Sequence, residues 1–207
     1  MNYICIEGNI GSGKTSLAKK LAAHYNAEFL GEEFEENPFL PLFYKEPEKF
    51  AFSLEFSFLL DRARQLISKK AELTNKLHFC DYFIEKCLYF AQINLPNAQF
   101  EEFKNAFPSI ESIVPKPDLL IFLHLNEKDL VRNIELRGRP FEKNISTDYL
   151  SKINHLYLKN SAIDRSFRVL DIKIRNSDKE TYQKVFEEVK SYIKYPPQAK
   201  YLELNLG

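Results

Sequence analysis

The sequence predicts an α/β fold in which an open, parallel, five-stranded sheet carries helices on both faces. Three observations support this prediction. Short apolar runs alternate along the chain with longer segments whose apolar residues recur every three or four positions. The apolar runs are unbroken, which is typical of parallel strands buried on both faces. The 207 residues are 44% hydrophobic and 28% charged, the balance of a globular protein with a substantial core.

No repeat, low-complexity tract or linker divides the chain, so we expect one domain over residues 1–207. The apolar runs predict strands at 3–7, 27–30, 77–82, the apolar part of 115–125, and 168–172. Helical spacing predicts helices at 15–25, 47–70, 84–94, 98–113, 127–137, 147–165 and 179–194, and Asn37-Pro38 is expected to start a short one. Pro196 and Pro197 cannot continue a helix. Residues of about 195–207 are therefore expected to form a docked tail or a dimer arm.

The charge balance and the cysteines narrow the class of protein. The 29 basic and 29 acidic residues cancel, which gives no general attraction to nucleic acid or to an anionic membrane. Cys5, Cys80 and Cys87 lack a paired spacing and are expected to be reduced thiols. No apolar run approaches about 18 residues, and the chain enters a predicted strand without a leader. We therefore expect a cytoplasmic protein that binds neither nucleic acid nor membrane.

The glycine-rich stretch EGNIGSGKTS, residues 7–16, lies between the first predicted strand and the first predicted helix. A glycine, four further residues and then Gly-Lys-Thr give the spacing of a phosphate-binding loop (P-loop). In such a loop, backbone N–H groups surround the phosphates, the lysine reaches the β- and γ-phosphates, and the hydroxyl can ligate Mg²⁺. The residues expected to bind the nucleotide are Gly8, Asn9, Ile10, Gly11, Ser12, Gly13, Lys14, Thr15 and Ser16.

A second cluster, RNIELRGRPFEKN, places Arg132, Arg137 and Arg139 at the end of a predicted helix and in the loop after it. Arginine is suited to clamping a transferring phosphoryl group, although many helix ends of this kind are only solvated charged surface. A GTPase would need a base-reading NKxD motif, which the sequence lacks, and an ATP-driven motor would usually need a larger chain. A small-molecule kinase is therefore the favoured class.

Acidic residues follow the second predicted strand in FLGEEFEENPFL, residues 29–40. In an open parallel sheet the ligand crevice lies beyond the carboxyl ends of the strands, so Glu32 or Glu33 is expected to face the P-loop. A carboxylate at that place can accept the proton of an attacking hydroxyl group.

Together, these stretches resemble the deoxynucleoside kinases over nearly the whole chain. The resemblance rests on IEGNIGSGKTSLA, EEFEENPFLPLFYKEPEKFAF, LEFSFLLDRARQL, CDYFIEKCLYFA, and KPDLLIFLHL through LRGRPFEK. It implies a P-loop kinase fold with an arginine-bearing lid at about 133–145, ATP as the phosphate donor with Mg²⁺, a deoxynucleoside as the acceptor, and a homodimer packed through helices.

The resemblance also assigns roles to individual residues. The family's general base falls on Glu32. Tyr44 and Glu142 match the residues that hold the sugar 3′-hydroxyl. Arg137 and Arg139 match lid arginines that, with Lys14, act on the donor phosphates. A further lid arginine of many relatives is replaced by Asn133, next to Arg132.

One motif departs from the family pattern. Many relatives carry Glu-Arg-Ser or Asp-Arg-Ser after the third strand, whereas this chain has Asp81-Tyr82-Phe83 with Lys86 farther on. Asp81 keeps the acidic group and, with Thr15, is expected to hold Mg²⁺ or its waters. Lys86 is the candidate for the missing positive charge. The Asp-Tyr form resembles the bacterial deoxyguanosine kinase branch.

Glu55 and Arg62 lie two helical turns apart on one predicted helix face, and the resemblance places both in the nucleoside pocket. A carboxylate only accepts hydrogen bonds and suits the N1–H and N2–H₂ donors of guanine, while arginine suits its O6 and N7. Phe52, Phe56 and Leu59 could flank the base, although such a stripe more often packs in a core.

The predicted activity is ATP-dependent phosphorylation of a purine deoxynucleoside, preferably deoxyguanosine, at its 5′-hydroxyl in nucleotide salvage. The nearest alternative is a deoxyadenosine or broad-specificity kinase of the same fold. A nucleoside monophosphate kinase would need more basic residues around its acceptor. A non-catalytic nucleotide-binding regulator is disfavoured by the retained carboxylate, lysine and arginines.

Overall fold

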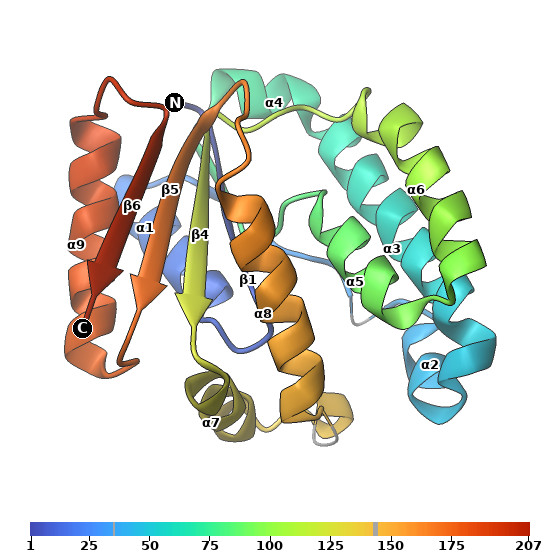
Figure 1. Ribbon diagram of the computed structural model, residues 1–207. Coiled ribbons are helices and arrows are strands. Elements are labelled where there is room, and N and C mark those ends of the chain that lie inside the picture. The colour runs from blue at the N-terminus through green and yellow to red at the C-terminus, as the bar shows by residue number, and fades with distance from the viewer. Residues whose placement is uncertain (35, 143–144) are drawn as a thin grey trace.

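A six-stranded sheet forms the centre of the computed structural model, which describes residues 1–34, 36–142 and 145–207 (Figure 1). Neighbouring strands run parallel, in the order β2-β3-β1-β4-β5-β6. The strands are β1 (Tyr3–Gly8), β2 (Glu28–Leu30), β3 (His78–Cys80), β4 (Leu119–Leu125), β5 (Arg168–Ile174) and β6 (Tyr201–Leu206). The predicted α/β fold with a parallel sheet is confirmed.

The sixth strand corrects the prediction of five. β6 lies in the segment expected as a docked tail or dimer arm, and it pairs in parallel with β5. Leu202, Leu204 and Leu206 point to one face of the sheet and pack against the apolar core there. This period of two marks a strand with one face toward solvent. The Pro196-Pro197 pair just before it obscures that signal in the sequence.

Helices cover both faces of the sheet (Figure 1). They are α1 (Lys14–Tyr25), α2 (Leu40–Lys45), α3 (Pro47–Ser68), α4 (Lys70–Asn75), α5 (Lys86–Asn94), α6 (Asn97–Glu111), α7 (Glu127–Arg137), α8 (Thr147–Ser161) and α9 (Lys179–Lys194), with a 3₁₀ turn at Pro140–Glu142. The sequence does not predict α4. The sequence also predicts that this last-but-one helix reaches Arg165, whereas α8 ends at Ser161. The Arg165 guanidinium folds back and donates to the Asn160 carbonyl (3.0 Å) in the last turn of α8.

Two apolar cores flank the sheet because successive residues of a strand point to opposite faces. On β4, Leu120 and Phe122 pack with α3, α5, α6 and α8. Leu119 and Ile121 pack on the other face with α1 and α9. Both faces are therefore covered along this strand, which explains its unbroken apolar sequence.

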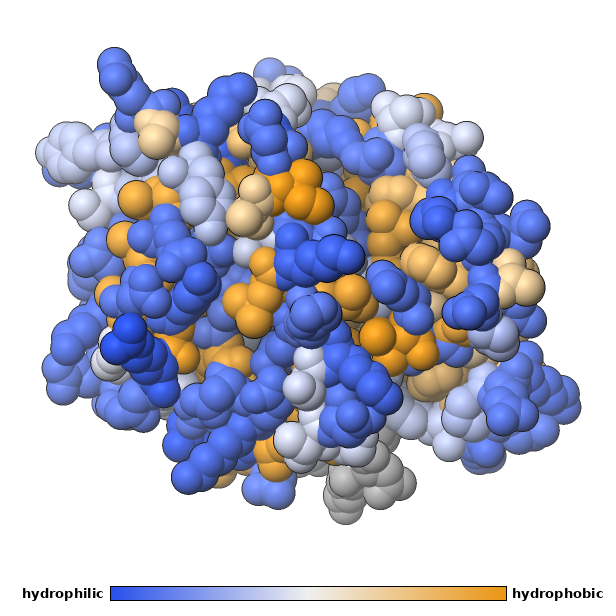
Figure 2. All heavy atoms as spheres, viewed as in Figure 1, coloured by the Kyte–Doolittle hydropathy of each residue, from blue (hydrophilic) through white to orange (hydrophobic). Residues whose placement is uncertain are grey.

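Polar side chains cover most of the face seen in Figure 2, and hydrophobic residues show between them in separate places. Within the described part of the chain, no helix is long and apolar enough to cross a membrane.

The carboxyl ends of β1, β2 and β3 meet at one edge of the sheet. β1 continues into the P-loop, β2 is followed by Glu32, and β3 is followed by Asp81. Because β3 lies between β2 and β1, these segments, far apart in the sequence, become neighbours at the edge where ligands bind in open parallel sheets.

Candidate active site

The P-loop turns sharply between β1 and α1 because two glycines adopt left-handed backbone conformations. The φ angle is 83° at Gly11 and 84° at Gly13. A Cβ at Gly11 would lie 2.7 Å from the carbonyl oxygen of Leu130, so no larger side chain fits there without a shift of the backbone. The loop leads directly into α1, whose free N–H groups and positive dipole end face it.

Side chains from α7 and α9 hold the carbonyl groups of the loop. Asn133 donates from Nδ2 to the Gly11 carbonyl (2.8 Å), and the Tyr182 hydroxyl donates to the Ser12 carbonyl (3.1 Å). With these carbonyls engaged by side chains, the loop's backbone orientation is fixed before any phosphate binds. Asn133, which the resemblance aligns with a lid arginine of the family, therefore holds the backbone of the P-loop.

Helix α8 is attached to the same loop. Asn9 donates from Nδ2 to the Asn154 side chain (2.8 Å) and to the Leu150 carbonyl (2.9 Å). Asn154 in turn donates to the carbonyl of Leu125 at the end of β4 (3.0 Å). These buried amides fix the position of the loop relative to the helix that follows the expected lid.

Glu7, the residue before the loop, is fully buried on β1. Its carboxylate accepts hydrogen bonds from the Gly8 N–H (2.8 Å), the Phe83 N–H (2.7 Å) and the Tyr157 hydroxyl (2.9 Å). A buried charge is costly unless it is well paired with donors. Glu7 therefore joins the P-loop to the segment after β3 and to α8.

Asp81 bridges the P-loop and the segment after β2. The Thr15 hydroxyl donates to Asp81 Oδ2 (2.5 Å), and the Glu32 N–H donates to Asp81 Oδ1 (2.9 Å). The two residues predicted to bind the metal are therefore neighbours.

Two cations hold the Glu32 carboxylate. Arg62 donates to Oε1 from Nε (2.9 Å) and also from Nη2, and Lys86 donates to Oε2 (2.9 Å). Burial by itself would raise the pKa of Glu32, but the charges of Arg62, Lys86 and Lys14 outweigh it and hold the pKa well below its usual range. Glu32 is thus ionised at neutral pH. Lys86 is thus one of the two cations paired with Glu32, and its replacement of the family's motif arginine stays a prediction.

Lys14 extends along the P-loop, and its Nζ donates to the Asn9 carbonyl (3.3 Å). Burial and the nearby ammonium of Lys86 lower the pKa of Lys14 to about 8. A bound polyphosphate would favour the charged form and oppose this effect.

The two arginines predicted for the lid, Arg137 and Arg139, both contact Glu142. Arg137 donates to Oε2 from Nε (3.0 Å) and Nη2 (2.6 Å), and Arg139 donates to Oε1 (3.4 Å). Tyr44 and Glu142 line the same cavity, and burial together with the Glu142 carboxylate raises the pKa of Tyr44 to about 12. The expected lid at 133–145 includes residues 143 and 144, which lie outside the described residues.

Two cavities meet at this edge of the sheet. The aromatic cavity, of about 340 Å³, is lined by Phe34, Phe43, Tyr44, Phe58, Phe90 and Tyr149 and by the polar side chains of Glu32, Glu55, Arg62, Asp81, Lys86, Asn94 and Glu142. The loop cavity, of about 440 Å³, is lined by P-loop residues together with Asn133, Leu136 and Tyr182. Lys14, Thr15, Arg137 and Arg139 line both cavities.

Glu55 lies in the aromatic cavity and is 2% exposed. Asn94 donates from Nδ2 to Glu55 Oε1 (2.7 Å). Burial raises the pKa of Glu55 to about 7 against the opposing effects of Asn94, Arg62 and Lys86. Arg62 lines the same cavity, but its hydrogen bonds go to Glu32 and to the thiol of Cys87 (2.9 Å). Its contact with a guanine base stays a prediction.

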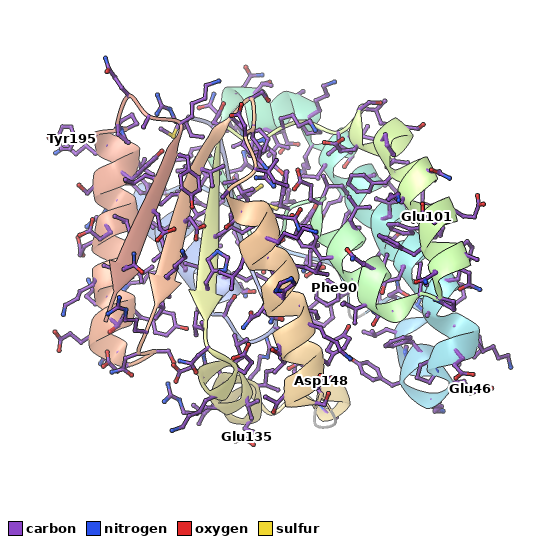
Figure 3. All side chains as sticks on the ribbon, viewed as in Figure 1. Glu46, Phe90, Glu101, Glu135, Asp148 and Tyr195 are labelled. Carbon is purple, nitrogen blue, oxygen red and sulfur yellow. The ribbon has the colours of Figure 1, made fainter. Side chains whose placement is uncertain are left out.

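The residues that the sequence suggested could flank the base, Phe52, Phe56 and Leu59, do not line the aromatic cavity. Phe56 packs edge-on against Phe103 with ring centres 4.9 Å apart, and Leu59 is fully buried in the same core. The aromatic wall comes instead from five separate segments; Phe90 of α5, labelled in Figure 3, is one member. The sequence carries no periodic signal for such a wall, because its residues meet only after the chain has folded.

Sequence reasoning also missed Glu7, Asn94 and Asn154. A buried acid inside an apolar strand was the available signal for Glu7, since such a charge needs partners. Asn94 and Asn154 lie on helices α5 and α8, where the sequence around an asparagine does not indicate its partner.

A family model described as deoxynucleoside kinase matches residues 4–194. The chain is 37% identical over 153 residues to a deoxyguanosine kinase of Bacillus subtilis, covering 73% of this chain and 74% of that protein. It is 31% identical over 156 residues to a deoxyadenosine kinase of Lactobacillus acidophilus, covering 72% of each chain. A solved deoxyadenosine kinase from M. mycoides shares the fold, with a TM-score of 0.78 at 22% identity over 93% of this chain and 99% of that one. This chain belongs to the deoxynucleoside kinase family.

Tyr157→Phe is expected to lower the free energy of unfolding by about 1.5–3 kcal/mol, because it removes one hydrogen bond to the buried carboxylate of Glu7. Tyr192→Phe is the matched control. Its buried hydroxyl has no hydrogen-bond partner among the described residues, so its loss should be neutral or stabilising. Urea unfolding of both variants measures the difference, and equal values would contradict the contact between Tyr157 and Glu7.

Proposed function

We propose that this kinase transfers the γ-phosphoryl group of ATP to the 5′-hydroxyl of a purine deoxynucleoside, with deoxyguanosine preferred, as a step of nucleotide salvage. The observation that carries the proposal is the meeting of the two cavities at Lys14, Thr15, Arg137 and Arg139. A nucleoside in the aromatic cavity and a triphosphate in the loop cavity would bring acceptor and donor together at these four residues.

Glu32 is the proposed acceptor for the proton of the 5′-hydroxyl. Arg62 and Lys86 keep it ionised, so it can always accept the hydrogen bond that orients the hydroxyl. The same charges make it a weak base, so the proton is expected to move as the phosphoryl group arrives rather than before. Positioning and charge compensation then supply most of the catalysis.

Thr15 and Asp81 fit a magnesium site. They offer a hydroxyl and a carboxylate oxygen side by side, and oxygen donors are what Mg²⁺ prefers, with the phosphates completing its coordination. No group of three or more His, Cys, Asp and Glu side chains suited to a metal is found within the described residues, which agrees with a site that depends on the nucleotide. When bound, Mg²⁺ would neutralise charge on the β- and γ-phosphates.

We assign Tyr44 and Glu142 to the sugar 3′-hydroxyl, and Lys14, Arg137 and Arg139 to the donor phosphates. The pairing of both arginines with Glu142 fits these roles, because the carboxylate that would contact the sugar also orients the cations that would contact the phosphates. A single buried carboxylate would thus connect the two substrates.

The preference for deoxyguanosine rests on Glu55, whose carboxylate suits the donors on guanine, and on the deoxyguanosine kinase name of the Bacillus subtilis relative. A deoxyadenosine or broad-specificity kinase is the alternative, since relatives with that name are also similar. The fold neighbour from M. mycoides was solved with bound dATP.

We further propose that the protein is a cytoplasmic homodimer. Leu60 and Ile67, two turns apart on α3, are 54% and 40% exposed and offer apolar surface for the dimer contact.

Turnover with labelled ATP and the four natural deoxynucleosides tests the proposed function. Deoxyguanosine is expected to give the highest kcat/KM, followed by deoxyadenosine. Phosphorylation of nucleoside monophosphates instead, or ATP binding without any transfer, would contradict the proposal.

Glu32→Gln is expected to lower kcat at least about a hundredfold while deoxynucleoside binding persists, because the amide cannot accept the proton. Glu33→Gln is the matched control, since Glu33 is exposed and its carboxylate accepts a hydrogen bond from Gln65 Nε2 (3.1 Å). Steady-state kinetics on both variants decides the assignment. A Glu32→Gln enzyme within about threefold of the parent would exclude Glu32 as the base.

Arg137→Ala is expected to lower kcat and kcat/KM together by about a hundredfold or more, as for loss of a cation that acts on the transition state. Arg132→Ala on the same helix is the control, because Arg132 donates to the Ser177 carbonyl (3.0 Å), pairs with Asp129, and lines neither cavity. A raised KM for the nucleoside with unchanged kcat would place Arg137 in the acceptor pocket.

A further inference from the structure

The two carboxylate oxygens of Glu55 have different surroundings. Oε1 accepts the hydrogen bond from Asn94, the last residue of α5. Oε2 is buried and has no hydrogen-bond partner among the described residues. The carboxyl group lines the aromatic cavity, where Tyr149 of α8 lies near Asn94.

A buried carboxylate with one unsatisfied oxygen is unfavourable. Two events can relieve it. A ligand can bring an N–H donor to Oε2, or Oε2 can take up a proton. Protonation is directed to Oε2, because Asn94 already donates to Oε1 and needs it as an acceptor.

We propose that Asn94 is a positioning residue that makes Oε2 of Glu55 the single atom that reads the base, accepting a hydrogen bond when Glu55 is ionised and donating one when it is protonated. This inference rests on the proposed function and specifies how that site selects its substrate.

The two states favour different purines. Guanine carries a donor at N1, which pairs with the ionised Oε2. Adenine carries an acceptor at N1, which pairs with the protonated Oε2. A mismatch places donor against donor or acceptor against acceptor in a buried site, and such a mismatch discriminates strongly between substrates.

Both states are populated near neutrality, because burial raises the pKa of Glu55 to about 7. The charged groups that face it, Arg62 on α3 and Lys86 on α5, favour its ionised form but do not overcome burial. Most other titratable groups around the cavity keep one charge state near pH 7. The pKa of Glu32 is lowered, so Glu32 stays ionised. The pKa is raised for Lys86, which stays charged, and for Cys87, Tyr44 and Tyr149, which stay neutral.

The test is the ratio of kcat/KM for deoxyguanosine to kcat/KM for deoxyadenosine, measured with saturating ATP between about pH 6 and pH 8. Ionisations that affect both nucleosides equally, such as that of Lys14, cancel in this ratio. The ratio should rise with pH and approach about tenfold per pH unit, the rate at which the ionised-to-protonated ratio of one group changes.

Two variants separate this inference from a structural role. Glu55→Gln removes the titration and should make the ratio independent of pH. Asn94→Leu removes the donor that favours the ionised form, so the pKa of Glu55 should rise, the whole profile of the ratio should move to higher pH, and the ratio at pH 7 should fall. Gln92→Leu, an exposed amide on the same helix, should leave both unchanged.

A ratio that is flat or falls with rising pH in the parent enzyme overturns the inference, as does a slope that persists in Glu55→Gln. If thermal denaturation shows that Asn94→Leu does not fold, the parent and Glu55→Gln profiles still decide. An enzyme that phosphorylates no deoxynucleoside would instead overturn the proposed function, so the two failures are distinguishable.

Discussion

The hydrogen bonds to the buried carboxylate of Glu7 are the interactions on which the arrangement of the candidate active site depends. The carboxylate accepts hydrogen bonds from the P-loop, from the segment after β3 and from α8. A charge without water must have each of its partners in place, so these three segments are held in one geometry. The neighbouring amide contact between Asn9 and Asn154 attaches α8 to the loop a second time.

The same principle organises the charges that face the substrates. Glu32 is held between Arg62 and Lys86, and Glu142 between Arg137 and Arg139. Each carboxylate has two cations, so each group carries a net positive charge toward the place where phosphates would bind. This arrangement suits a reaction in which negative charge must be brought close to an attacking hydroxyl.

Much of the candidate active site could be predicted from short segments of the sequence, because the residues that each part of it needs are close together in the chain. The P-loop needs glycine where φ is positive and a lysine and hydroxyl at the start of α1, and these residues are adjacent in the chain. The place after the second strand pointed to Glu32 or Glu33, and the resemblance to the family then singled out Glu32 and Asp81. Asn94 could not be found in this way, since its partner Glu55 lies on another helix and no spacing connects them.

The sequence by itself determined the parallel α/β fold, the P-loop and the family, because unbroken apolar strands, helical periodicity and a contiguous motif are all written within short segments. Tertiary structure alone decided that β6 joins the sheet, that the aromatic cavity draws its wall from separate segments, and that Arg62 contacts Glu32 and Cys87. These outcomes depend on which buried polar groups and apolar faces meet after folding, and neighbouring residues in the chain do not specify those meetings.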